Sequence, residues 1–188
     1  SVALATQNAQ ALSPLAIVNG ITSSGGVGVS KNILYGDEPN QDLDIYYPKP
    51  LAQAMKAQST NTDGAINDRY PMVVFVHGGS WESGNKDQYA FVGQSLAQAG
   101  YVTAVINYRK APEHVYPDYV KDTAQAIAWS MNNAPSLHAD PKRLAVIGHS
   151  AGAFNAVAAV ANEDFLAPYG IKPKDIKAVV GIAGPYSY

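Results

Sequence analysis

Arg143-Leu144-Ala145-Val146-Ile147-Gly148-His149-Ser150-Ala151-Gly152-Ala153-Phe154-Asn155 is the stretch that decides the fold. A run of apolar residues leads directly into the Gly-x-Ser-x-Gly motif at 148–152, and an alanine-rich segment follows at once. This order predicts a buried strand, a very tight turn and a helix, with Ser150 at the tip of the turn. Such a turn holds a serine in a strained backbone conformation so that its hydroxyl stands clear of the sheet.

The residues beside Ser150 fit that geometry. Gly148 and Gly152 are small, as required where a strand and a helix pass close to each other. The start of the helix also points backbone N–H groups towards the reacting atom. The motif alone arises by chance in many chains, but its position between a strand pattern and a helix pattern makes Ser150 the predicted nucleophile.

Length and composition predict one domain. The chain has 188 residues, of which 47% are hydrophobic, so a sizeable core is expected. A formal net charge of −2 favours neither nucleic acid nor an anionic membrane as a partner. No apolar run is long enough for a membrane span. Cysteine is absent and the histidines form no His-x-x-x-His pair, so neither a metal site nor any other cofactor is expected.

Residues 1–30 are rich in Ala, Gly, Ser, Asn and Gln and carry little charge. We interpret them as a flexible N-terminal leader, and residues 31–188 as the N-terminal part of a single domain. Because the first residue is Ser1 rather than methionine, a processed, extracytoplasmic bacterial protein is one expectation. An ordinary cytoplasmic tail is the alternative.

The rest of the chain alternates between strand and helix patterns. Residues 42–47 alternate between apolar and polar, which predicts a half-exposed strand near a sheet edge, and residues 51–69 are expected to be a surface insertion. Further strands are expected at 29–35, 72–76, 101–106, 143–147 and 176–183, and helices at 89–99, 117–133 and from Ala151 to about Ala161. This order predicts an α/β fold with a mostly parallel central sheet and helices on both faces.

Three further motifs accompany the serine: His77-Gly78-Gly79-Ser80-Trp81, Asn107-Tyr108-Arg109 and Asp140-Pro141-x-Arg143. Together with Gly148–Gly152 they resemble esterases of the α/β-hydrolase fold that carry an HGG-x-W oxyanion motif. This group contains hormone-sensitive-lipase-like carboxylesterases, bacterial feruloyl/acetyl esterases and kynurenine formamidases. The resemblance covers the chain from about Tyr35 to its end.

The resemblance implies roles for the motif residues. The amides of Gly79, Ser80 and Ala151 would form the oxyanion hole. His77, beside Gly78, would shape the loop by hydrogen bonding. Trp81 would line the pocket, although a plain core position is an equal alternative. A Gly-Gly loop independently suits this chemistry, because acyl transfer passes through an oxyanion that backbone N–H donors can approach without a side-chain clash.

The base and the acid of a catalytic triad are missing. In this fold the order along the chain is Ser, acid, His, and no histidine follows His149. His149 lies inside the elbow, His77 in the oxyanion loop, and neither His114 nor His138 is expected to reach Ser150. Asp118 and Asp122 precede the serine and are interpreted as a helix cap and part of a solvated face.

We therefore expect an α/β-hydrolase sheet that is truncated after about the sixth strand, with an apolar edge at Val179, Val180 and Ile182. A C-terminal fragment of the same protein, present as a second chain, would dock on that edge and supply the acid and the histidine. The expected function is hydrolysis of small or aromatic acyl esters through an acyl-enzyme on Ser150, and this chain alone would be inactive. The alternatives are an arylformamidase-type amidase and an inactive binding module.

Overall fold

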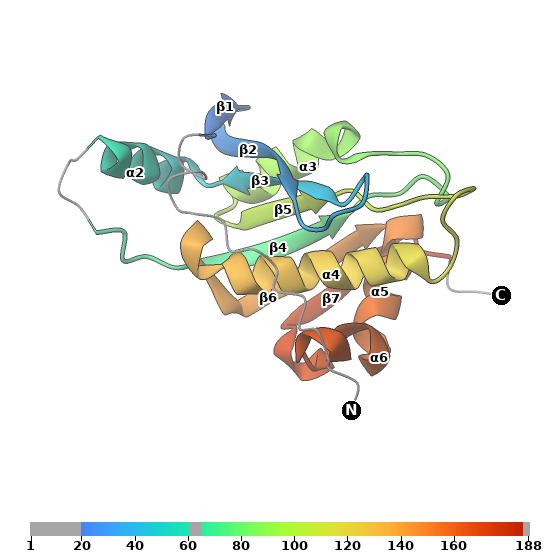
Figure 1. Cartoon of the computed structure of the whole chain (residues 1–188). Coiled ribbons are helices and arrows are strands. Elements are labelled where there is room, and N and C mark those ends of the chain that lie inside the picture. Colours follow the sequence, from blue (N-terminus) through green and yellow to red (C-terminus); the bar gives the residue numbers. More distant parts are fainter. Residues whose placement is uncertain (1–19, 61–64, 186–188) are drawn as a thin grey trace.

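The computed structural model describes residues 20–60 and 65–185 (Figure 1). They form one seven-stranded sheet in the order β1-β2-β3-β5-β4-β6-β7. The strands are β1 Thr22–Ser24, β2 Val27–Leu34, β3 Asp42–Tyr47, β4 Tyr70–Val76, β5 Val102–Ile106, β6 Ala139–His149 and β7 Ala178–Ile182. The α-helices are α2 Lys49–Ser59, α3 Ala90–Gln98, α4 Asp118–Asn133, α5 Ala151–Ala161 and α6 Glu163–Leu166. Short 3₁₀ helices lie at Lys86–Tyr89, Pro135–Leu137, Ala167–Tyr169 and Pro173–Asp175.

The half of the sheet that carries the predicted motifs is parallel. β4 lies between β5 and β6 and runs parallel to both, and β7 runs parallel to β6 at the edge. β4 is buried from Met72 onwards, as its continuous apolar run predicts. Helix α4 crosses the face of the sheet that points forward in Figure 1, and α3 lies on the other side. The predicted α/β fold with helices on both faces is confirmed.

The antiparallel half differs from the prediction at β3. This strand is not half exposed at an edge, because it lies between β2 and β5 and is buried from Leu43 to Tyr47. Helix α3 covers its second face so closely that a Cβ on Gly93 would lie 2.3 Å from the Tyr46 ring. Asp44 is fully buried because Lys86 pairs with it at 2.9 Å.

Two other assignments also change. Residues 22–30 of the predicted leader belong to the sheet, where Val27 and Val29 are buried, while residues 1–19 lie outside the described part. The predicted insertion at 51–69 begins with helix α2, which buries Leu51 and Met55. These two apolar residues share one helix face at i, i+4 spacing. Most residues around them are polar, so the segment does not show a clear amphipathic helix pattern in the sequence.

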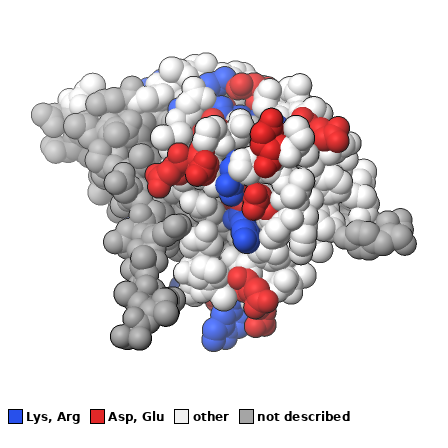
Figure 2. Space-filling view, turned by 45° about the vertical axis from the view of Figure 1, so that its right-hand side comes forward, with Lys and Arg blue, Asp and Glu red and all other residues white. Residues whose placement is uncertain are grey.

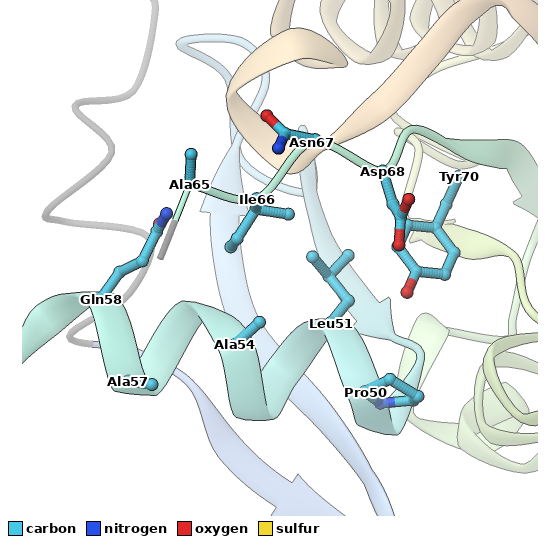
Figure 3. A pocket seen from close by; sticks show the side chains of 10 residues that line it. All are labelled: Pro50, Leu51, Ala54, Ala57, Gln58, Ala65, Ile66, Asn67, Asp68 and Tyr70. Carbon is cyan, nitrogen blue, oxygen red and sulfur yellow. The ribbon is translucent and has the colours of Figure 1, made fainter. Parts of the chain in front are cut away.

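Helix α2 and residues 65–70 line a pocket of about 520 Å³ (Figure 3). Leu51 and Ile66 point towards each other across it. The pocket lies where β4 begins, at Tyr70, whereas the predicted oxyanion loop follows the other end of that strand. It is therefore separate from the site described below.

The two faces of the sheet have cores of unequal size. The larger cluster lies against α4 and α5 and includes Trp129 and Ile127. The smaller cluster, beside α3, consists of Val27, Val29, Tyr46, Phe75, Ala97 and Val105. Helix α3 turns Gly93 and Ala97 inwards, whereas Phe91 is 61% exposed.

Candidate active site

Ser150 occupies the predicted turn between β6 and α5. Its backbone has φ 55° and ψ −120°, a conformation that is strained for any residue with a side chain. Helix and strand also pass as close to each other as predicted, because a Cβ on Gly152 would lie 2.2 Å from the Val76 carbonyl oxygen. A Cβ on Gly148 would lie 2.2 Å from the Gly152 carbonyl oxygen. Both glycines are thus required by the crossing of helix and strand.

The neighbouring strand fixes the turn. The Ser150 N–H donates to the Ile182 carbonyl oxygen of β7 at 2.8 Å, immediately after the last paired residues of β6 and β7. The Ala153 N–H donates to the Ser150 carbonyl oxygen at 2.9 Å and begins helix α5. The serine is therefore held by backbone bonds on both sides.

The loop at 77–85 lies directly against this turn. A Cβ on Gly78 would lie 3.1 Å from the Ser150 Cβ and 3.0 Å from the His149 carbonyl oxygen. Gly79 has φ +130°, and a Cβ there would lie 2.1 Å from the Ser83 carbonyl oxygen. The two motifs that the sequence singled out, far apart along the chain, therefore meet at one place.

The first three peptide carbonyls of the loop, those of His77, Gly78 and Gly79, are all engaged. The His77 carbonyl accepts from the Tyr108 hydroxyl at 3.0 Å. The Gly78 carbonyl accepts from His77 Nδ1 at 2.6 Å. The Gly79 carbonyl accepts from the Ser83 N–H at 2.9 Å and from the Ser83 hydroxyl at 3.0 Å.

The amides on the opposite side of these peptides are available. In a trans peptide the C=O and N–H groups point in opposite directions, so holding the Gly78 and Gly79 carbonyls orients the N–H groups of Gly79 and Ser80. Neither N–H has an acceptor within residues 20–60 and 65–185, and nor does that of Ala151. Three backbone donors beside Ser150 are thus free to bind an anionic oxygen.

His77 is a structural part of the loop. It is fully buried and stacks on Tyr108 with ring centroids 4.4 Å apart. Burial lowers the pKa of His77 to about 4, so the ring is neutral at physiological pH. Because Nδ1 donates to Gly78, Nε2 is the unprotonated nitrogen, and it has no partner in the described part of the chain.

Trp81 joins the loop to helix α5. Its indole N–H donates to the Asn155 side-chain oxygen at 2.8 Å, and Asn155 is fully buried. The ring stacks on Tyr119 and meets Phe154 edge-on, with both centroid distances 5.6 Å. Trp81 is half-buried against the larger core, so it both packs and positions the loop.

None of the four histidines hydrogen-bonds the Ser150 hydroxyl, and all four lie in the described part of the chain. The partners of His77, His149, His114 and His138 are the Gly78 carbonyl, Tyr89, Asp118 and Arg69. The described residues therefore provide a candidate nucleophile and candidate oxyanion donors, but no histidine that hydrogen-bonds the serine.

Several residues that hold the site escaped the sequence reasoning. Asp122 is fully buried rather than solvated, and its carboxylate binds the Arg109 guanidinium at 2.8 Å. This hydrogen bond raises the pKa of Arg109. Pro117, not Asp118, precedes the first residue of α4, and Asp118 pairs with His114 instead.

The Asn107-Tyr108-Arg109 triplet has a clear structural role. Asn107 accepts from the Lys86 N–H at 2.8 Å, just beyond the loop at 77–85, and Tyr108 holds the His77 carbonyl at the start of that loop. The sequence singled out the triplet as a motif, but only the fold shows which residues its side chains contact. Nothing in the sequence marked Tyr89, whose hydroxyl accepts from the Gly78 N–H at 3.3 Å.

Surface charge, membrane-spanning helices and metal-ligand clusters point to no further function among the described residues. On the face in Figure 2, acidic and basic side chains are interspersed and form no large patch of one sign. No helix among the described residues is long and apolar enough to cross a membrane. In the same residues, no three potential metal-ligating side chains of His, Cys, Asp or Glu gather together.

The BD-FAE family model matches residues 61–187, which include the loop, the turn and both strands beside it. The chain belongs to the BD-FAE family. The match confirms the resemblance to α/β-hydrolase esterases that the motifs indicated.

Named relatives of this BD-FAE chain are esterases. It is 33% identical over 163 residues to isoprenylcysteine alpha-carbonyl methylesterase of Arabidopsis thaliana, covering 85% of this chain and 35% of the relative. It is 34% identical over 165 residues to esterase LipC of Mycobacterium tuberculosis, covering 84% and 37%. The chain thus spans little more than a third of the length of these relatives.

Solved structures agree on the fold. Esterase 2 of Thermogutta terrifontis superposes with a TM-score of 0.64 at 26% identity, over 89% of this chain and 54% of that one. Esterase B of Lactobacillus rhamnosis gives a TM-score of 0.68 at 20% identity, over 91% and 53%. The second likeness concerns the fold alone.

Proposed function

We propose that this protein is a carboxylic-ester hydrolase that works through an acyl-enzyme on Ser150. The observation that carries the proposal is the meeting of a serine at φ 55° with the unengaged amides of Gly79, Ser80 and Ala151. A serine held in this way is the arrangement that acyl transfer needs. The esterase relatives support the same reaction class.

The reaction uses these groups in turn. A base takes the Ser150 hydroxyl proton as the oxygen attacks the ester carbonyl, and the resulting oxyanion binds the three amides. Collapse of the tetrahedral intermediate breaks the bond to the alcohol, which leaves with the proton from the base. Water then attacks the acyl-enzyme by the same steps and releases the acid. Removal of one oxyanion donor typically costs ~10²–10³-fold in rate.

We propose that the base and its carboxylate come from a C-terminal part of the same protein, docked along the open edge of β7. That edge strand exposes Val180 at 45% and Ile182 at 49%, and Ile182 also holds the Ser150 amide. A segment placed there would lie beside the nucleophile. A purified sample with full esterase activity, whose only species by intact mass spectrometry has the 19.9 kDa of this chain, would refute the proposal.

The proposed substrates are small or aromatic acyl esters, which follows the resemblance rather than a shaped pocket. Hydrolysis of p-nitrophenyl, feruloyl and acetyl esters, compared with formyl-kynurenine, separates an esterase from an arylformamidase-type amidase. An inactive binding module would hydrolyse none of them.

The decisive experiment is covalent labelling of the complete protein, with any C-terminal part present. Paraoxon is a suitable probe, because Thermogutta terrifontis esterase 2 has been solved phosphorylated by it. We expect the label on the peptide that contains Ser150. Ser150→Ala should abolish labelling and lower hydrolysis by at least ~10⁴-fold. Ser136→Ala, in the 3₁₀ helix that precedes the far end of β6, is the matched control. An unlabelled complete protein would overturn the proposed function.

A further inference from the structure

The peptide that joins His77 and Gly78 is held at both ends by tyrosine hydroxyls. Tyr108 donates to its carbonyl at 3.0 Å, and its N–H donates to the Tyr89 oxygen at 3.3 Å. Tyr108 is fully buried, whereas Tyr89 is half-buried beside helix α3. The entry to the oxyanion loop therefore depends on two residues that lie outside the loop.

Tyr89 makes a second contact that Tyr108 does not. Its oxygen lies 2.9 Å from Nδ1 of His149, the residue before Ser150. The hydroxyl can accept from the Gly78 N–H and hydrogen-bond His149 Nδ1 at the same time. One hydroxyl thus joins the oxyanion loop to the nucleophile turn.

We propose that Tyr89 is a positioning residue whose hydroxyl sets the alignment of the oxyanion amides with Ser150. The inference rests on the proposed function. The loop and the turn that Tyr89 joins are closely packed, since a Cβ on Gly78 would lie 3.1 Å from the Ser150 Cβ. Small displacements matter at such a junction, because a misplacement of ~1 Å can cost ~10²-fold in rate.

The hydroxyl can be separated from the packing of the ring. The Tyr89 ring packs on Phe75 and Phe91, with centroid distances of 5.3 Å and 6.1 Å. Phenylalanine would keep these contacts and remove only the bridge between Gly78 and His149. The bound ester carries no oxyanion, which develops only in the transition state and the tetrahedral intermediate, so the loss should lower kcat and leave KM unchanged.

The test compares Tyr89→Phe with Tyr101→Phe in the complete protein. Tyr101 is 37% exposed, and its hydroxyl has no hydrogen bond in the described part of the chain. For Tyr89→Phe we expect a ~10-fold fall both in kcat for p-nitrophenyl acetate and in the rate of paraoxon labelling. KM and Tm should remain those of the wild type. Tyr101→Phe should change none of these values.

The outcomes distinguish this inference from the function on which it rests. If the wild type is labelled and Tyr89→Phe matches it in kcat, the positioning role is wrong. A change in KM alone, or a kcat loss that only follows a lower Tm, also overturns it. If the wild type itself is not labelled at Ser150, the proposed function fails first and the inference falls with it.

Discussion

The turn at Ser150 and the loop at 77–85 lie against each other but are held by different means. The turn is fixed by backbone: Ser150 bonds to β7, and Gly148 and Gly152 allow helix and strand to touch. The loop is fixed largely by side chains, such as Tyr108 on the His77 carbonyl. A turn held by backbone bonds keeps its geometry as long as the sheet is folded. A loop held by side chains can lose its alignment while the fold survives.

The largest effect is expected from Gly152→Ala. The added Cβ would lie 2.2 Å from the Val76 carbonyl oxygen and 2.4 Å from that of His77, and neither backbone oxygen at the end of the central strand can move aside cheaply. We expect the free energy of unfolding to fall by more than about 4 kcal/mol, measured by urea denaturation.

Gly170→Ala is the control for this prediction. Gly170 has φ +70° and no atom within 4 Å of a built Cβ, so its substitution costs only backbone strain, about 1–2 kcal/mol. Similar losses for the two variants would show that the crossing of helix and strand is not what requires Gly152.

The same contrast explains what the sequence could predict. The turn depends on residues that are adjacent in the chain, so the pattern from Leu144 to Asn155 predicted its strand, its serine and its helix. The loop motif at His77 was also recognised. Tyr108 was recognised as part of a motif but not as a partner of the loop, and Tyr89 was not recognised as a site residue, because their hydroxyls reach the loop only after the sheet has brought separate strands together.

Errors at the antiparallel side have a related cause. The alternation of apolar and polar residues in β3 correctly indicated a strand. Without knowledge of its partner Lys86, however, Asp44 is expected to face solvent. Burial lowers the pKa of Lys86, but the hydrogen bond and charge of Asp44 outweigh this and hold it above its ordinary value. A buried ion pair between distant residues leaves no local signal in either segment.

A second prediction concerns the pH dependence of the loop. Burial lowers the pKa of His77 from 6.5 to about 4, so between these values the unfolded chain binds a proton that the folded chain does not. Stability from this residue is complete above pH 6.5 and is lost as pH falls towards 4. The loss is about 3 kcal/mol across this window.

His77→Asn isolates that contribution. Its amide nitrogen takes the place of Nδ1 and can still donate to the Gly78 carbonyl, but it does not titrate. Urea denaturation from pH 7 to pH 4 should therefore show a shallower decline for His77→Asn than for the wild type. Parallel curves would contradict the assignment of a neutral, buried His77.

The smallest effect is expected at Trp81. Trp81→Phe removes the indole N–H that donates to Asn155 at 2.8 Å and leaves that buried oxygen without its partner. We expect a loss of about 1–2 kcal/mol in the free energy of unfolding.

A double-mutant cycle with Asn155→Leu tests whether this hydrogen bond is the cause. Asn155 is fully buried, and its side-chain nitrogen has no partner among the described residues, so leucine removes both an engaged and an unengaged polar atom. When the acceptor is already absent, Trp81→Phe should cost about 1 kcal/mol less than in the wild type. Equal costs in both backgrounds would mean that Trp81 acts through ring packing alone. The loop would then owe its alignment on this side to the core rather than to a polar contact.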